Sequence, residues 1–489
     1  MKRIIKALNQ TDLGIKYLIF GFVSAAVACA VYGLVSFESW YPGLQIFFTK
    51  QTFDLIRSAL DQGFGTFVIA PILFCGCGHL LLRNEFSAPR TLPDWFGAAA
   101  FWMLALAFVL LIGSCFASNK PQVPTADSWS VLTPLIPKGG APNSMIVLYF
   151  ASVLANLSFV ITSISFIISF YACRMSGSTI RKLSVTSWLY LITAIFLLMS
   201  FALQLYAIHQ ITSAPEHGQA FFIKASDPLL LKHWYRGDIQ QFLIFFPALA
   251  VVSAAVAKTS ARAIVGNKAM IFSIYAMGLV ALTGLLTTIE GGASLVHQYE
   301  VQIARIFLFS ISLLVILSCW IATLFYASHL KITPTLWVIG FMFCNIVIGS
   351  IFVFTFMANP LNSSPNLFDS YFYSLSLNPT IPLTAIFAVF AFWYAFFEEI
   401  TGKIYSPMLA NLHFGFAFTG IGFKLSPLFT LGVIFLPSHL GEPKASPPNW
   451  YLLASFADYI IFASVVLSLM AYILARGNER TKDRSFVIS

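Results

Sequence analysis

The sequence has very little charge. Only 10% of its 489 residues are Asp, Glu, Lys or Arg, whereas 58% are hydrophobic, and the mean hydropathy is +0.82. A soluble domain carries about 25% charged residues, so this composition excludes a water-soluble protein of this length. The net charge of +9 is distributed between apolar runs and does not predict a nucleic-acid partner. We conclude that the chain is an integral membrane protein whose surroundings are the lipid bilayer.

Several kinds of functional motif are also missing. The sequence contains no glycine-rich phosphate loop and no recognisable Ser, His and acidic set of a hydrolase. Its seven cysteines lie within or at the ends of apolar segments, which excludes a secreted-type disulfide framework. Within one of these segments, Cys75-Gly76-Cys77 indicates a close approach of two helices rather than a metal site. The eight histidines include no adjacent pair and no H-x-H, and we interpret all eight as interfacial or capping residues.

Long apolar runs dominate what remains. A membrane-spanning helix needs roughly 20 apolar residues, and windows of that length predict twelve spans. They lie near 15–36, 58–82, 95–117, 144–173, 184–212, 238–257, 269–289, 303–328, 334–357, 371–398, 407–436 and 449–475. The first run is too long for a cleaved signal. The sequence therefore predicts an all-α integral membrane protein: one twelve-helix domain over residues 1–489, with short tails at 1–14 and 476–489.

The basic residues predict the orientation of these spans. An even number of helices puts both termini on one side, and that side carries eighteen of the 28 Lys and Arg residues. These are Lys2, Arg3, Lys6, Lys16, Arg83, Arg90, Arg174, Arg181, Lys182, Lys258, Arg262, Lys268, Lys331, Lys403, Arg476, Arg480, Lys482 and Arg484. Lys and Arg accumulate in cytoplasmic loops, so we expect both termini in the cytoplasm, as in a bacterial inner membrane.

One predicted span opens on an unusually polar stretch, WYRGDIQQFLIFFP at residues 234–247. Arg236 and Asp238 precede two glutamines at the mouth of this span, and polar groups at membrane depth are costly unless they serve a function. Asp238 with Glu290 and His297 could form a site for a hard metal or for proton handling. The alternative is that Arg236, Asp238 and interfacial water satisfy one another.

Short motifs in a shared order resemble subunit I of the heme–copper oxidase family, the catalytic subunit of cytochrome c oxidase. Trp234, Gly237 and Pro247 match the spacing of the family's W-F-F-G-H-P-E-V-Y helix and its later proline. Three further segments are similar to S-W-L-A-T-L, L-W-A-L-G-F-I-F and K-I-H-F-T-I-M-F-I-G-V-N. They are CWIATLF at 319–325, LWVIGFMF at 336–343 and NLHFGFAFTGIGF at 411–423.

The resemblance implies two hemes and a copper ion, which active members hold with six histidines. Heme iron takes axial nitrogen ligands and this copper takes imidazoles. Placed on this sequence, the six positions are occupied by Leu60, Asp238, Thr287, Thr288, Ser376 and Asn378. The family's active-site tyrosine falls on Phe242 and its proton-channel lysine on Ile316. We therefore expect no cofactor, no catalytic residue and no metal ligand here.

Three functions follow as hypotheses. The first is a degenerate subunit I, not an enzyme on its own, that acts as an accessory, assembly or regulatory subunit with other respiratory-complex subunits. The second is an active terminal oxidase or related reductase, which transfers electrons to O₂ through ligands that the motifs do not reveal. The third is a membrane transporter, although the short loop at 258–268 and the lack of a repeat disfavour two six-helix halves.

Overall fold

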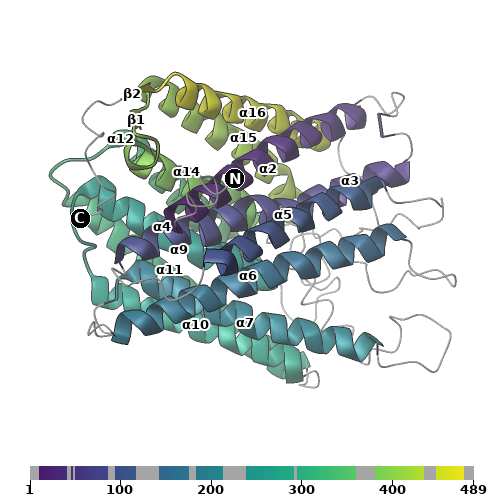
Figure 1. Cartoon of the computed structure of the whole chain (residues 1–489), viewed down its shortest axis with the longest axis horizontal. Coiled ribbons are helices and arrows are strands. Elements are labelled where there is room, and N and C mark those ends of the chain that lie inside the picture. Colours follow the sequence, from purple (N-terminus) through teal and green to yellow (C-terminus); the bar gives the residue numbers. More distant parts are fainter. Residues whose placement is uncertain are drawn as a thin grey trace.

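The protein is a bundle of long helices that run side by side along its longest axis (Figure 1). The structure is a computed structural model that describes residues 10–40, 46–47, 50–85, 94–116, 143–175, 183–212, 238–290, 295–358, 380–433 and 448–477. Within these ranges almost all residues are helical, which confirms the predicted all-α class.

The described helices follow the order of the predicted spans. Those of the first half are α2 (Gln10–Trp40), α3 (Lys50–Gly63), η1 (Phe64–Ile69), η2 (Pro71–Gly76), α4 (Cys77–Glu85), α5 (Asp94–Phe116), α6 (Asn143–Met175) and α7 (Val185–Thr212). Those of the second half are α9 (Asp238–Ser260), α10 (Asn267–Glu290), α11 (Leu295–Phe325), α12 (Ile332–Ala358), α14 (Thr380–Thr401), α15 (Pro407–Val433) and α16 (Pro448–Ile473). Two-residue strands β1 (Lys403–Ile404) and β2 (Arg476–Gly477) complete the described elements.

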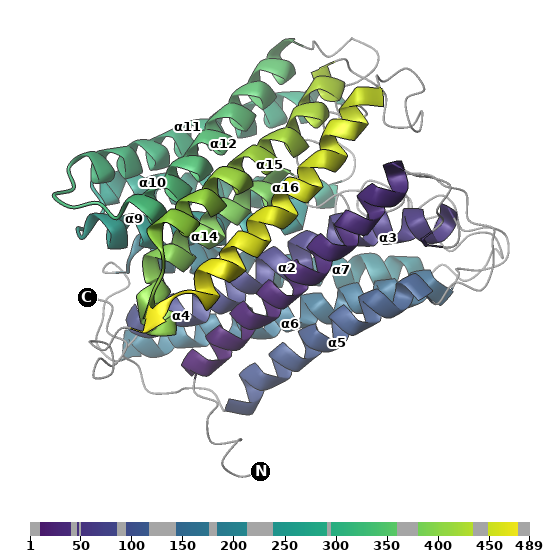
Figure 2. The same cartoon turned by 90° about the horizontal axis from the view of Figure 1, so that it is seen from above.

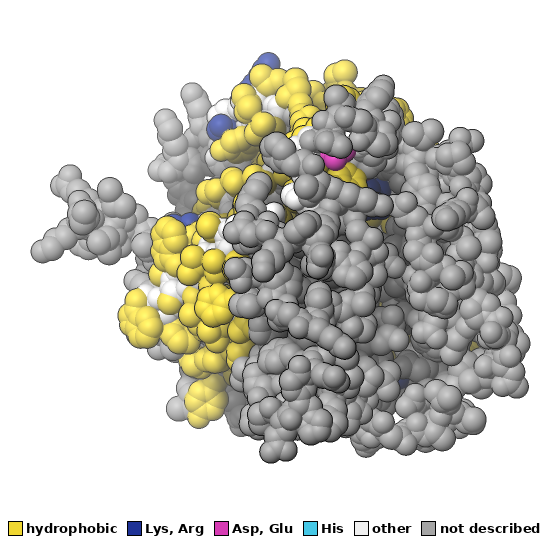
Figure 3. Space-filling view, turned by 90° about the vertical axis from the view of Figure 1, so that its right-hand side faces the viewer, with side chains coloured by type: hydrophobic (Ala, Val, Ile, Leu, Met, Phe, Trp, Pro, Cys, Tyr) yellow, Lys and Arg dark blue, Asp and Glu magenta, His cyan; other side chains and the backbone are white. Residues whose placement is uncertain are grey.

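The lengths of these helices suit a bilayer. Within the described residues, nine helices are long and apolar enough to cross a membrane, and α10, α12 and α15 account for the other predicted spans. Large apolar side chains cover the outer surface, including Trp102 at 68% exposure, Phe272 at 75% and Phe325 at 81%. Figure 3 looks onto one end of the bundle, where the described side chains that show beside the grey atoms are mostly hydrophobic. Exposed apolar side chains such as Trp102, Phe272 and Phe325 are stable when lipid tails surround them.

Both ends of the described chain meet at one end of the bundle. The antiparallel pair β1–β2 joins the turn after α14 to the end of α16, with Lys403 opposite Gly477 and Ile404 opposite Arg476. Helix α2 packs along α16 and begins near that same end (Figure 2). This placement agrees with an even number of crossings.

The predicted tails contain some regular structure. Helix α2 begins at Gln10, within the predicted tail 1–14. Arg476 and Gly477, at the start of the predicted tail 476–489, form β2. The division into one membrane domain with two short tails stays a prediction.

The second span, α9 and α14 form the centre of the bundle. Residues 65–82 are all buried, and α9 packs against η1, η2 and α14. Helix α9 achieves this because alanines, among them Ala248 and Ala255, let neighbouring helices approach closely. Trp320 of α11 is also fully buried, and its indole N–H donates to the hydroxyl oxygen of Ser253 in α9 at 3.2 Å.

The second span is not a regular α-helix. Two π-helical turns, η1 and η2, adjoin Pro71, which is the first residue of η2. Proline lacks the N–H that would bond to the carbonyl four residues earlier, so the hydrogen-bond ladder is displaced there. Just beyond, Gly76 faces α2: a Cβ atom at Gly76 would lie 2.8 Å from Leu18 Cδ2 and 3.3 Å from the carbonyl oxygen of Gly14. The Cys75-Gly76-Cys77 segment therefore serves close helix packing, as predicted.

Helix α14 is the described part of the tenth predicted span. Helix α14 starts at Thr380, directly after Pro379, and residues 371–379 lie outside the described residues. Pro382 lies in the first turn of α14, where a missing N–H costs no helical hydrogen bond. The helix ends at Thr401 because Gly402 adopts the left-handed conformation, with φ of 67°, and its N–H donates to the Glu398 carbonyl at 3.0 Å.

Candidate functional site

The structure places four of the six ligand positions that the resemblance predicts on helices. Leu60 lies in α3 and packs, half-buried, against the core. Asp238 is the first residue of α9, and Thr287 and Thr288 lie in the last turn of α10. The other two, Ser376 and Asn378, lie outside the described residues. The Leu60 side chain has no nitrogen, oxygen or sulfur atom, so it cannot bind a heme iron at this position.

The proposed polar cluster of Asp238, Glu290 and His297 falls on three helix termini. Asp238 begins α9, Glu290 ends α10, and His297 lies in the first turn of α11. Helices α9 and α10 are antiparallel neighbours in sequence, and α11 packs on both, so these termini lie at the end of the bundle opposite β1 and β2. Their side chains lie outside the described part of the structure. Their joining into one site therefore stays a prediction.

Aromatic side chains fill the described interior beside these positions. Phe245, less than two turns after the copper position at Asp238, is buried and packs against Phe246 and against Phe309 of α11 at ring-centroid distances of 6.4 and 5.4 Å. Ile316, at the position of the family's channel lysine, is fully buried in α11. The described side chains at Phe245 and Ile316 are therefore apolar and buried.

His413 of α15 is enclosed by rings. Its Nδ1 atom lies 2.9 Å from the hydroxyl of Tyr394 in α14, and its ring lies 4.3 Å from that of Phe390 and 4.7 Å from that of Trp337. The side chain is fully buried, and its Nε2 atom has no hydrogen-bond partner among the described residues. The interpretation of this histidine as an interfacial or capping residue is therefore wrong.

His79, near the end of the second span, is buried as well. Its ring stacks on that of Tyr17 in α2 at 6.0 Å and meets the edge of Phe166 in α6 at 5.0 Å. The capping interpretation is wrong for this histidine too. Sequence periodicity could not reveal either burial, because the enclosing rings come from other helices.

The described residues do not fit a heme or a copper centre. The axial heme ligand that the resemblance implies is a histidine nitrogen, and it must face a space that can hold the heme. Nε2 of His413 is the one buried histidine nitrogen without a partner in the described part, and aromatic rings within 5 Å enclose that imidazole. In addition, no group of three or more His, Cys, Asp and Glu side chains is placed to hold a metal ion among the residues that the structure describes.

Sequence reasoning missed an ion pair inside the bundle. The ammonium group of Lys424 in α15 contacts both carboxylate oxygens of Asp458 in α16, and the hydroxyl of Ser36 in α2 donates to the same carboxylate at 2.7 Å. The ammonium group also lies 5.4 Å from the ring centre of Tyr32. Each charged residue interrupts an apolar span, which is the signal that could have revealed the site.

Two further ion pairs lie at the β1–β2 end. Lys258 at the end of α9 pairs with Glu399 of α14, and Lys331 pairs with Glu398 at 3.7 Å. Tyr405, in the turn between α14 and α15, is largely enclosed beside them. Burial raises the pKa of the Tyr405 phenol. A hydrogen bond with Thr333 lowers this pKa in part, and the negative charge of nearby Glu398 raises it. This end is a polar rim that the sequence predicts to face the cytoplasm.

Comparisons of the sequence with known proteins identify its family. The profile of a family described as cytochrome c and quinol oxidase polypeptide I matches residues 12–473. Cytochrome c oxidase subunit 1 of Cereibacter sphaeroides is 24% identical over 519 aligned residues, which cover 98% of this chain and 90% of that protein. Cytochrome c oxidase subunit 1 of Eremothecium gossypii is 24% identical, over 96% of this chain and 87% of that protein. The chain therefore belongs to the heme–copper oxidase subunit I family.

Proposed function

We propose that this chain is a degenerate subunit I, which keeps the family's helical bundle without its redox centres. In this role it acts as an accessory, assembly or regulatory subunit of a respiratory complex rather than as an enzyme on its own. The proposal treats residues 1–489 as one membrane domain. Its environment would be a bacterial inner membrane with both termini in the cytoplasm, as the distribution of basic residues indicates.

The observation that carries the proposal is the absence of a usable heme ligand among the described buried histidines. His413 is bonded to Tyr394 and enclosed by Trp337 and Phe390, and His79 lies between Tyr17 and Phe166. Leu60, at one of the family's heme-ligand positions, has no donor atom at all. Low-spin heme needs two strong axial ligands and copper needs imidazoles, so these substitutions oppose both centres.

An active oxidase is the second candidate, and the relatives favour it. Both named relatives are cytochrome c oxidase subunits, and the alignments span nearly the whole chain. If the chain is active, its hemes must be held by side chains that the structure does not describe. Asp238, Glu290 and His297 are then the first residues to consider.

An absorption spectrum of the purified protein separates the two candidates. Membranes that contain the tagged chain are solubilised in mild detergent, and the preparation is analysed by pyridine hemochrome assay and by metal analysis for iron and copper. The Cereibacter sphaeroides relative, purified in the same way, is the positive control. The proposal expects no Soret band and no stoichiometric metal, and one heme per chain would overturn it.

The same preparation tests the accessory role. A subunit of a respiratory complex should co-purify with other subunits of that complex under mild detergent. Isolation as a single polypeptide, with solute uptake after reconstitution into liposomes, would support the transporter hypothesis instead.

A further inference from the structure

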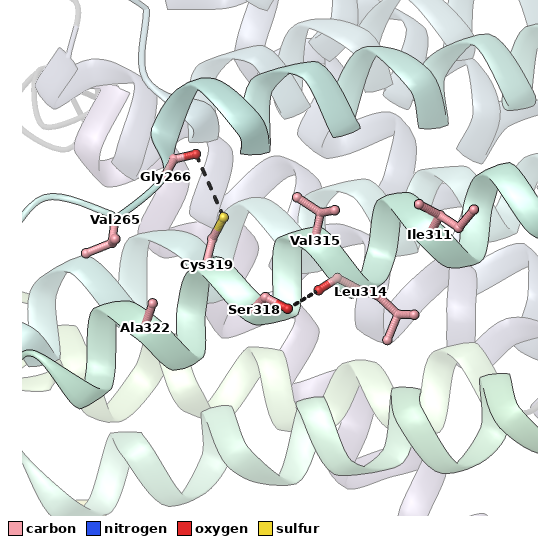
Figure 4. Close-up of a pocket in the computed structure, with 8 residues that line it drawn as sticks. All are labelled: Val265, Gly266, Ile311, Leu314, Val315, Ser318, Cys319 and Ala322. Atoms are coloured by element: carbon pink, nitrogen blue, oxygen red, sulfur yellow. Dashed lines mark hydrogen bonds between the residues drawn. The ribbon is translucent and has the colours of Figure 1, made fainter.

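A groove opens on the lipid-facing surface between α10 and α11. Its volume is about 370 Å³, and its lining includes Val265, Gly266, Ile311, Leu314, Ser318 and Ala322. Figure 4 shows these residues along α11 and in the turn just before α10. From Ile311 to Ala322 the groove follows α11 for about 16 Å, at 1.5 Å per residue. Ile311 and Leu314 are both more than half exposed, so the groove is open to the membrane.

The polar atoms of the groove are already bonded to the protein. The Ser318 hydroxyl donates to the carbonyl of Leu314 at 2.8 Å, and the Cys319 thiol donates to the carbonyl of Gly266 at 3.8 Å. Both bonds are visible in Figure 4. The N–H of Val265 donates to the Thr323 hydroxyl at 2.9 Å. The groove therefore presents an apolar wall that suits a hydrocarbon chain.

A cation lies at the end of this groove. Arg262 precedes Val265 by three residues, and its guanidinium donates to the carbonyl of Tyr326, which follows Ala322 by four residues, at 2.8 Å. The guanidinium also lies 6.0 Å from the centre of the Tyr326 ring. Both side chains are exposed. Because a guanidinium has five N–H donors, Arg262 keeps donors for a phosphate or another anion at the membrane surface.

The chemistry of the groove favours an acyl chain as its occupant. A hydrocarbon chain needs no hydrogen-bond partner, and the polar atoms along the groove are already bonded within the protein. The combination of an apolar groove with an arginine and an exposed tyrosine at its interfacial end is typical of a lipid site.

We propose that the α10–α11 groove holds one acyl chain of an anionic phospholipid whose phosphate is bound by Arg262. The lipid would occupy the leaflet at the β1–β2 end of the bundle. Exposed Lys268, two residues after Gly266, adds positive charge to the same loop. The site is independent of any heme, because none of its residues belongs to the positions that carry the family's redox ligands.

Native mass spectrometry of the detergent-purified chain tests the site. The probes are phosphatidylglycerol and phosphatidylcholine with identical acyl chains. We expect wild type to retain phosphatidylglycerol about fivefold better, the effect of one cation near the surface. Arg262→Gln should abolish this preference. Ser318→Trp, which fills the groove, should reduce retention of both lipids.

Matched controls make each outcome decisive. Lys403→Gln removes an equivalent cation away from the groove, and Ile321→Trp adds the same bulk at a half-exposed position of α11 outside the lining. Both should behave as wild type. Raising the salt concentration to 1 M should reduce the retention of phosphatidylglycerol but not of phosphatidylcholine by the wild-type protein. This test needs no variant. Equal retention of the two lipids by wild type would overturn the proposal. So would an Arg262→Gln variant that matches Lys403→Gln, or a Ser318→Trp variant that matches Ile321→Trp.

Discussion

The ammonium nitrogen of Lys424 lies 2.7 Å from Oδ1 and 2.9 Å from Oδ2 of Asp458, and α15 and α16 contain no other Asp, Glu, Lys or Arg. Ser36 donates a third hydrogen bond to this carboxylate, so the pair joins α2, α15 and α16. The exposed fractions of the two side chains are 25% for Lys424 and 9% for Asp458. Charges at such depth are tolerated because they satisfy each other.

Removing either member of the Lys424–Asp458 ion pair should lower the free energy of unfolding. We expect Asp458→Asn or Lys424→Met to lower stability by about 3–5 kcal/mol, because each leaves an uncompensated group in a low-dielectric environment. The double variant Lys424→Met with Asp458→Leu should recover most of this loss. Thermal unfolding in detergent, followed by tryptophan fluorescence, measures the effect. Equal losses in the single and double variants would show that the charges are not coupled.

The contact between the second span and α2 predicts a sharp difference between two glycines. Gly76→Ala places a methyl group 2.8 Å from Leu18 and should destabilise the protein by about 1–3 kcal/mol. Gly113→Ala in α5, where no atom lies within 4 Å of the new Cβ, should stabilise it by roughly 0.5–1 kcal/mol. The midpoint of thermal unfolding reports both. A neutral Gly76→Ala variant would contradict the close packing described above.

His413 and His79 should behave as packing residues. Tyr394→Phe removes the partner of His413 Nδ1 and should cost about 1–3 kcal/mol, because it leaves a buried polar atom unsatisfied. His413→Gln and His79→Gln should lower the unfolding midpoint and leave the visible absorption spectrum unchanged. A spectral change in either histidine variant would identify that residue as a heme ligand.

Tyr405 should titrate late. Its pKa is raised in the folded protein, chiefly by burial, so its contribution to stability is complete below the ordinary tyrosine pKa of about 10. The contribution of Tyr405 to stability is lost as the pH rises from about 10 through the pKa that Tyr405 has in the folded protein. Ultraviolet titration of wild type and of Tyr405→Phe should reveal, by difference, one tyrosine that ionises above pH 10. A difference curve with its midpoint at or below pH 10 would oppose the enclosed position of Tyr405.

The orientation in the membrane is also open to measurement. A reporter enzyme fused after Ser489 should be active only in the cytoplasm, because the loops on the same side as the termini carry most of the basic residues. A fusion within residues 118–137, in the predicted loop between the third and fourth spans, serves as the opposite control. Periplasmic activity at Ser489 would require one crossing fewer or one more.

The helical bundle was predictable because the length of an apolar run is a local property. The windows at 95–117 and 144–173 differ from α5 and α6 by one or two residues. Tertiary features were harder to predict. His413 occurs singly in an apolar helix, and its burial depends on Trp337 and Phe390 of other helices. In the same way, Lys424 and Asp458 are visible as charges, whereas their pairing depends on how α15 and α16 rotate against each other.

The bond between Ser36 and Asp458 has a consequence for biosynthesis. Its partners are 422 residues apart, so a ribosome that adds about 5–20 residues per second makes the second roughly 20–85 s after the first. During that interval α2 resides in the membrane without its last neighbour, and Lys424 emerges before the carboxylate that neutralises it. Completion of the bundle thus waits for the final helix. A nascent chain that terminates before α16 exposes an unpaired lysine, which quality-control proteases could recognise.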